Sequence, residues 1–257
     1  MFRPRLIPVL LLKNLGLVKT IKFNKPRYIG DPINAVKIFN NLKADELVFL
    51  DINASKENKK ISLDFVKKVG AEANMPFSVG GGIKSIDDIR EIISAGAEKV
   101  VLNTFAFKNP NFVKEASEEF GSSTIVVSID VKKRFLKGEQ VYIYGGTKPT
   151  GQKPLEYAQL IESLGAGEII INCIENDGVM NGYNINLIKN ISENVSIPTV
   201  ALGGAGSFSD FSEAIINGNA SAVAAGSKFV YHGPRNAVLI NYPNRDEILN
   251  IFNLWNY

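Results

Sequence analysis

The sequence predicts a closed (βα)8 barrel, an α/β fold, because short apolar segments alternate with helical segments and because the chain repeats internally. Eight apolar runs, rich in Val, Ile, Leu and Ala, are mostly flanked by Gly, Asp or Asn. Such runs are typical of parallel strands that are buried on both faces. We expect strands at Leu6–Leu12, Leu47–Ile52, Phe77–Val79, Val100–Leu102, Ile125–Ile129, Ile169–Ile174, Thr199–Leu202 and Ala222–Ala225.

The segments between these runs carry apolar residues at helical spacing, as in Ile86–Ala95, Pro154–Leu164 and Phe208–Asn217. Eight strands that alternate with helices favour a closed barrel over an open sheet. Near the C-terminus, we expect Phe252 and Trp255 to pack the last helix against the barrel.

The two halves of the chain match each other at a constant offset of 122 residues. The matched pairs are Glu46 and Glu168, Pro76 and Pro198, Gly81-Gly82 and Gly203-Gly204, Ser85 and Ser207, Asp88 and Asp210, Gly96 and Gly218, and Val101 and Val223. One offset that holds over so long a span indicates duplication. We therefore expect one domain over residues 1–257, built from half-barrels at about 1–121 and 122–257.

Composition excludes several classes of protein. The chain has 257 residues, 45% of them hydrophobic, and a net charge of +3 with scattered lysines, which does not favour a nucleic-acid partner. The single Cys173 excludes a disulfide framework and suits a reducing cytosol. The apolar run near the N-terminus is too short to cross a membrane. We expect a cytoplasmic protein without a membrane partner, and, since neither metal-ligand spacing nor a dinucleotide fingerprint occurs, without a metal or cofactor.

Small and polar residues follow the strands of both halves at equivalent places, and barrels of this kind bind ligands at the C-terminal ends of their strands. Glycine lets a backbone approach an anion closely, so that loop N–H groups point at it. Two such sites predict a long ligand with a phosphate at each end, although tight turns alone would also use glycine. The predicted residues are Gly80–Gly82 and Asn103-Thr104 in the first half, and Gly203–Gly206 and Gly226-Ser227 in the second.

Over nearly its whole length the sequence resembles the cyclase subunit of imidazole glycerol phosphate synthase, the barrel partner of a glutamine amidotransferase. The resemblance implies a bisphosphorylated ribonucleotide ligand, ammonia as co-substrate, and ligand contacts at Lys19 (in the first βα loop, roughly 13–30), Asp51, Asp177 and Gly178. The motifs that carry it are Gly30-Asp31-Pro32, Asp45–Ile52, Pro76–Ile83, Asn103-Thr104, Ser128-Ile129-Asp130, Gly165–Glu168 and Asp177-Gly178.

The family uses two aspartates as general acid and base, at the ends of the first and fifth strands. The fifth-strand aspartate is present as Asp130, which could alternatively cap the following loop. The first-strand aspartate is replaced by Leu11, which cannot transfer a proton. Ring closure should therefore be impaired by several orders of magnitude unless another group substitutes. The candidates for that substitution are Lys19, Asp51 and Asp177.

Four charged residues precede strands at the opposite end of the predicted barrel: Arg5, Glu46, Lys99 and Glu168. In the resembled family, the matching residues gate a tunnel through which ammonia enters from a docked glutaminase. A stabilising ring of charges is the alternative. The chain itself is not expected to hydrolyse glutamine, because its one Cys and one His, Cys173 and His232, are expected to be packing or surface residues.

Three functions remain at this stage. The chain most resembles divergent paralogues of this cyclase that keep the barrel and its glutaminase partner but lack the first-strand aspartate, and Leu11 favours this function. The resemblance implies an ammonia-accepting subunit that binds a bisphosphorylated or nucleotide-sugar-type ligand. It also implies two partners, a glutaminase and a sugar amidotransferase that makes an acetamidino group on a surface-polysaccharide sugar. The first alternative is the histidine-pathway cyclase. The second alternative is a non-catalytic scaffold that binds a phosphorylated ligand.

Overall fold

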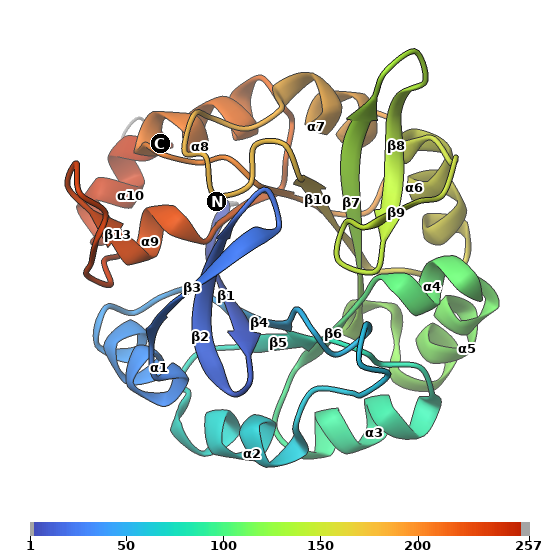
Figure 1. Ribbon diagram of the computed structural model, residues 1–257, viewed down its shortest axis with the longest axis horizontal. Coiled ribbons are helices and arrows are strands. Elements are labelled where there is room, and N and C mark those ends of the chain that lie inside the picture. Colours follow the sequence, from blue (N-terminus) through green and yellow to red (C-terminus); the bar gives the residue numbers. More distant parts are fainter. Residues whose placement is uncertain (1–2, 253–257) are drawn as a thin grey trace.

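A computed structural model describes residues 3–252 of the chain. Eight parallel strands form a closed barrel in the order β1, β4, β5, β6, β7, β10, β11, β12, and β12 pairs with β1 (Figure 1). The fold predicted from the sequence is confirmed, and the expected strands agree to within two residues except at the C-terminal end of β7. The strands are β1 (Arg5–Lys13), β4 (Leu47–Asp51), β5 (Phe77–Gly80), β6 (Lys99–Leu102), β7 (Ile125–Arg134), β10 (Glu168–Cys173), β11 (Thr199–Leu202) and β12 (Ala222–Ala225).

Helices surround the barrel as an outer ring (Figure 1). Serine side chains cap two of them, α3 and α8, in capping boxes with an aspartate three residues on, at Ser85 with Asp88 and Ser207 with Asp210. The helices are α1 (Pro32–Asn41), α2 (Leu63–Glu72), α3 (Ile86–Ser94), α4 (Thr104–Lys108), α5 (Asn111–Phe120), α6 (Pro154–Ser163), α7 (Ile185–Ser192), α8 (Phe208–Ile216), α9 (Ser227–Val230) and α10 (Arg245–Ile251), with one 3₁₀ turn at Ser122–Thr124.

The strands are buried on both faces, which is why their sequences are nearly continuous apolar runs. On β1, Leu6 and Leu10 belong to the core between strands and helices, whereas Ile7 and Val9 belong to a second core inside the barrel. The inner core is completed by Val48, Val101, Val126, Ile170, Val200, Leu202, Ala222 and Ala224. Burial on both faces fixes the direction of each side chain, so that polar residues at inward positions face the barrel axis.

The segment expected to be the first βα loop is instead an antiparallel hairpin, formed by β2 (Gly16–Ile21) and β3 (Asn24–Gly30), which lies across the barrel mouth (Figure 1). Its apolar core is only Leu17 and Val18, followed by the buried Lys19 and Thr20. A strand this short, interrupted by charge, has no apolar run that would predict it.

Two further departures concern the edges of the barrel. β7 continues five residues beyond its expected end and pairs with β8 (Gly138–Ile143), which pairs with β9 (Lys148–Pro149). A small hairpin of β13 (Tyr231–His232) and β14 (Ala237–Val238) follows α9. Phe252 is buried, and Trp255 lies outside the described residues. Within residues 3–252, none of the helices has the length and apolar character needed to cross a membrane.

Candidate functional site

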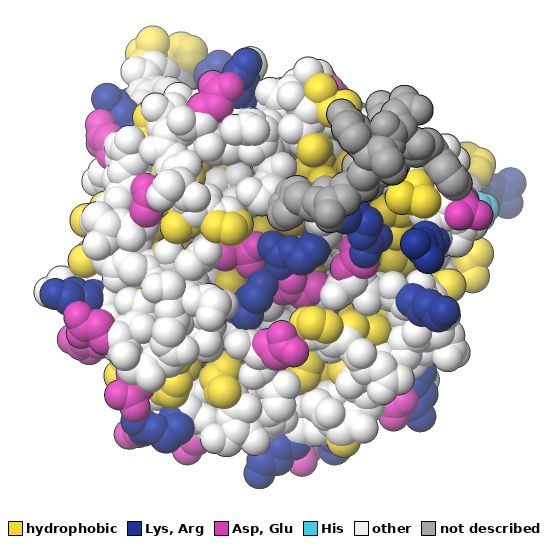
Figure 2. Space-filling view, turned by 180° about the vertical axis from the view of Figure 1, so that it is seen from behind, with side chains coloured by type: hydrophobic (Ala, Val, Ile, Leu, Met, Phe, Trp, Pro, Cys, Tyr) yellow, Lys and Arg dark blue, Asp and Glu magenta, His cyan; other side chains and the backbone are white. Residues whose placement is uncertain are grey.

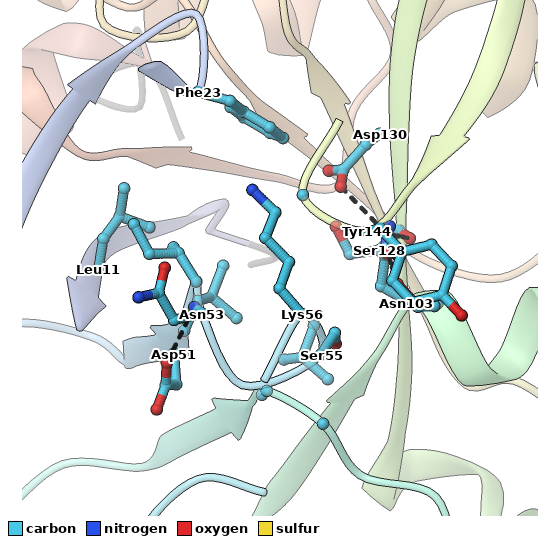
Figure 3. A pocket seen from close by; sticks show the side chains of 18 of the residues that line it. Leu11, Phe23, Asp51, Asn53, Ser55, Lys56, Asn103, Ser128, Asp130 and Tyr144 are labelled. Carbon is cyan, nitrogen blue, oxygen red and sulfur yellow. Dashed lines mark hydrogen bonds between the residues drawn. The ribbon is translucent and has the colours of Figure 1, made fainter. Parts of the chain in front are cut away.

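A cavity of about 450 Å³ opens at the C-terminal ends of the barrel strands (Figure 3). Most of the side chains and glycines predicted from the sequence line it together, although they come from seven different βα units. Those residues are Lys19, Asp51, Gly81, Gly82, Asn103, Thr104, Asp130, Asp177, Gly226 and Ser227, and Leu11 lines the same cavity.

Asp130 lies on β7 inside the barrel mouth, with 7% of its surface exposed. Its carboxylate accepts hydrogen bonds from Asn103 Nδ2 at 3.1 Å and Asn172 Nδ2 at 3.3 Å. Burial raises the pKa of Asp130 to about 7, and the nearby charge of Asp177 adds to this effect, whereas the hydrogen bonds lower the pKa and offset part of the rise. Its hydrogen-bond partners belong to neighbouring strands and not to its own loop, so the capping alternative finds no support. A carboxyl with this pKa can both give and take a proton near neutral pH.

Leu11 stands on β1 beside Leu50 of β4, and in Figure 3 it lies across the cavity from Asp130. Its apolar side chain contributes no titratable group to the cavity. Of the candidate substitutes, Asp51 is engaged in capping its own loop: its Oδ1 accepts the backbone N–H groups of Asn53 at 3.0 Å and Ala54 at 3.1 Å. Burial raises the pKa of Asp51 despite these bonds.

The other two candidates, Lys19 and Asp177, interact with each other at the second half of the barrel. Lys19 Nζ donates to the carbonyl of Val9 at 2.6 Å. It also lies beside Gly226, and a Cβ on Gly226 would lie only 2.4 Å from Lys19 Nζ. Burial lowers the pKa of Lys19 to about 8 and raises that of Asp177 to about 6, and each charge partly offsets the effect on the other. This pair places an ammonium group at the predicted second anion site, next to Gly226-Ser227.

The glycine loops pack closely under neighbouring loops in both halves. Gly82 has a φ of +69°, and a Cβ there would lie 1.7 Å from the carbonyl oxygen of Lys59. Gly204 has a φ of +126°, and a Cβ there would lie 2.1 Å from the carbonyl oxygen of Gly182. Close packing is therefore sufficient to require glycine at these positions. The presence of glycine alone does not establish a phosphate site.

The two halves differ in how open their glycine loops are. Gly81 and Gly82 line the cavity, whereas Gly178, Gly203 and Gly204 do not. The loop between β10 and α7 covers Gly203-Gly204, and the N–H group of Gly182 in this loop donates to the carbonyl of Gly204 at 2.9 Å. Phosphate binding at Gly203-Gly204 stays a prediction, and it requires this loop to move.

At the N-terminal end of the strands, the four residues singled out by the sequence form a closed ring of alternating charge, hereafter the charge ring (Arg5, Glu46, Lys99, Glu168). Arg5 pairs with both glutamates, and Lys99 Nζ lies 3.4 Å from a Glu46 oxygen and 3.0 Å from a Glu168 oxygen. Both glutamates are almost fully buried, and Ser78 Oγ also donates to Glu46 at 2.9 Å. Figure 2 shows acidic and basic side chains gathered at the centre of this face.

Sequence reasoning missed several residues of the cavity, notably Phe23, Lys56, Tyr144 and Gly145. They come from the hairpin β2–β3, the loop after β4 and the turn between β8 and β9, which sequence patterns did not place. The one available signal was a segment with three lysines in five residues, at 56–60. Within residues 3–252, no group of His, Cys, Asp and Glu side chains is arranged to hold a metal ion.

Comparison with known proteins addresses the family directly. The model of the family described as "Histidine biosynthesis protein" matches residues 5–234. A provisionally named imidazole glycerol phosphate synthase subunit hisF2 of Pseudomonas aeruginosa is 46% identical over 248 residues, 96% of this chain and 99% of the relative. The imidazole glycerol phosphate synthase subunit HisF of Alkaliphilus metalliredigens is 41% identical over 232 residues, 90% of this chain and 92% of the relative.

The chain belongs to the HisF family. The resemblance stated from the sequence is thereby confirmed. HisF relatives also include a provisionally named HisF subunit of Leptospira interrogans, 45% identical over 248 residues, with 96% of this chain and 98% of the relative covered. Within this HisF barrel, Leu11 places an apolar side chain on the cavity wall opposite Asp130.

Proposed function

We propose that this HisF-type barrel is the ammonia-accepting subunit of a glutamine-dependent complex. The observation that carries the proposal is the charge ring, which closes the end of the barrel opposite the ligand cavity. Four charges that satisfy one another leave a polar but neutral plug, and a neutral NH3 molecule can pass such a plug more readily than an ion. Two buried serines offer hydrogen bonds at the two ends of this route, Ser78 beside Glu46 of the charge ring and Ser128 in the lining of the cavity.

The partner in this proposal is a HisH-like glutaminase that docks on the face of the charge ring. The relatives are named as synthase subunits, which supports a partner. The chain's own side chains do not supply a Cys–His pair: Cys173 is buried in β10, where burial raises the pKa of its thiol, and His232 is exposed on β13. A nucleophilic cysteine needs the opposite shift.

The ligand in this proposal is a molecule with phosphate at both ends. Seven lysines and three aspartates line the cavity, a larger excess of positive charge than the chain as a whole carries. Such an excess in a concave site favours a ligand of several negative charges. The predicted contacts are Gly81, Gly82, Asn103 and Thr104 at one end, and Lys19, Gly226 and Ser227 at the other.

Leu11 favours an acceptor whose chemistry is completed elsewhere. In that version the barrel passes ammonia on toward a sugar amidotransferase that acts on a surface-polysaccharide or nucleotide-linked sugar. The second candidate is the histidine-pathway cyclase, which the names of the HisF relatives favour and which Asp130 would serve as general acid or base. Both candidates share ammonia entry through the charge ring.

Removing Lys99 tests ammonia entry. Lys99→Met leaves two buried glutamates with one cation, Arg5, so the ring should no longer close. We expect the complex of this variant with the glutaminase to lose several-fold in glutamine-dependent turnover while turnover with added ammonium salt is kept. The measurement is the ratio of these two rates for the formation of imidazole glycerol phosphate, made in the Leu11→Asp background so that the cyclase reaction can be followed.

Lys68→Met is the matched control, since Lys68 pairs with Asp64 on the exposed face of α2 and lies outside the charge ring. Sedimentation of the complex separates loss of docking from loss of ammonia transfer. An unchanged rate ratio in Lys99→Met, with the complex intact, would mean that the charge ring serves stability alone.

A further inference from the structure

Lys56 is one of six lysines lining the cavity to which the proposed function assigns no contact. It lies in the loop between β4 and α2, and its side chain extends into the cavity between Leu11 and Asp130 (Figure 3). Among the ion pairs and hydrogen bonds of residues 3–252, its ammonium group has no partner. Gly145, in the turn after β8, leaves the room that this side chain needs: a Cβ there would lie 3.2 Å from Lys56 Cε and 3.3 Å from Nζ.

The acidic groups around Lys56 are already engaged. On its own loop, Asp51 caps backbone N–H groups, and Glu57 accepts from Asn53 at 3.2 Å and from Lys59 at 3.2 Å. On the opposite wall, Asp130 is held by Asn103 and Asn172, and Asp177 by Thr20 and Lys19. The charge of Lys56 is therefore not balanced by the protein.

Leu11 contributes to this imbalance. Leu11 and Lys56 face the same part of the cavity in Figure 3, so an acid at position 11 would offer Lys56 a counter-charge close by. With leucine there, the counter-charge has to come from the ligand. A cation that projects into a site with no internal partner binds an anion without first breaking an ion pair, which favours binding.

We propose that Lys56 binds an anionic group in the middle of the ligand, between its two terminal phosphates. This inference rests on the proposed function, because it assumes that the phosphates are held at the two ends of the cavity. The ligand class it names is a bisphosphate with a third negative group, such as a carboxylate, near its centre.

Two matched probes test the proposal by calorimetric titration of the full-length chain. One is 1,9-nonanediol bisphosphate, and the other is the same molecule with a carboxylate on its central carbon. We expect the chain to bind the carboxylated probe about tenfold more tightly, the effect of one hydrogen-bonded charge pair. In Lys56→Met both probes should bind with equal affinity, and Lys56→Arg should keep most of the preference.

Lys59→Met is the matched control, because Lys59 also lines the cavity but is paired with Glu57, so this variant should keep the preference for the carboxylate. Leu11→Asp, with Lys56 intact, should lose it. If both probes bind but the wild-type chain shows no preference, or Lys56→Met retains it, the role of Lys56 is refuted while the phosphate sites stand. If neither probe binds, the phosphate sites of the proposed function fail, and the inference fails with them.

Discussion

Leu11→Asp should raise the cyclase activity of this chain by roughly two to four orders of magnitude, the usual contribution of a positioned general acid or base. The substitution places a carboxyl group on β1 opposite Asp130, at a half-buried position that lines the cavity. The new side chain can contact water in the cavity, so the free-energy cost of burying its charge should be small. The measurement is the formation of imidazole glycerol phosphate from the formimino ribonucleotide substrate with added ammonium salt.

Leu11→Asn is the control, because asparagine has nearly the shape and polarity of aspartate but cannot transfer a proton. It should leave the activity at the wild-type level. If asparagine raised the rate as much as aspartate, the gain would come from the polarity of the side chain and not from proton transfer. If aspartate had no effect with ligand binding intact, other changes in the cavity would have abolished the cyclase reaction.

Asp130→Asn in the Leu11→Asp background should remove the gain again, by a similar factor. Asp130 is the one group in the cavity wall that combines deep burial, a pKa of about 7 and hydrogen bonds that hold it in place. Asparagine fits the same site and keeps the fold. The check is a comparison of rate constants under saturating ligand for the single and double variants.

The pH dependence of the Leu11→Asp rate gives a second readout. Burial raises the pKa of Asp130 from its ordinary value of 3.8 to about 7, so its base form grows as the pH rises through about 7. If Asp130 acts as the base, the rate should increase over this interval and level off above it. Asp130→Asn should abolish that limb. A rate that falls through pH 7 would assign Asp130 the role of acid instead.

The barrel could be predicted from the sequence because its strands are buried on two faces, which leaves a strong local pattern of apolar runs. The charge ring was predictable for a related reason: Arg5, Glu46 and Lys99 stand immediately before or at the start of such runs, and strand starts meet at one end of a parallel barrel. Asp130 was identified through the resemblance to the cyclase family, and its place at the other end of the barrel agrees with where such barrels bind their ligands.

The remaining parts of the site lie on segments whose structure depends on long-range packing. The hairpin β2–β3 has only Leu17 and Val18 as a buried core, so nothing in its sequence distinguishes it from a loop. Lys56 reaches the cavity because Gly145, about ninety positions further along the chain, leaves space for it. Covering of Gly203-Gly204 by the loop before α7 is a contact between two loops, and no local pattern encodes it.

Growth of a histidine auxotroph that lacks its cyclase subunit tests most directly whether Leu11 separates ammonia acceptance from ring closure. The strain should carry a matching glutaminase and either the wild-type chain or Leu11→Asp at equal protein levels. We predict that the wild-type chain will fail to restore growth without histidine and that Leu11→Asp will restore it. Growth supported by the wild-type chain would contradict the account, because it would show that this HisF barrel closes the ring without a first-strand acid.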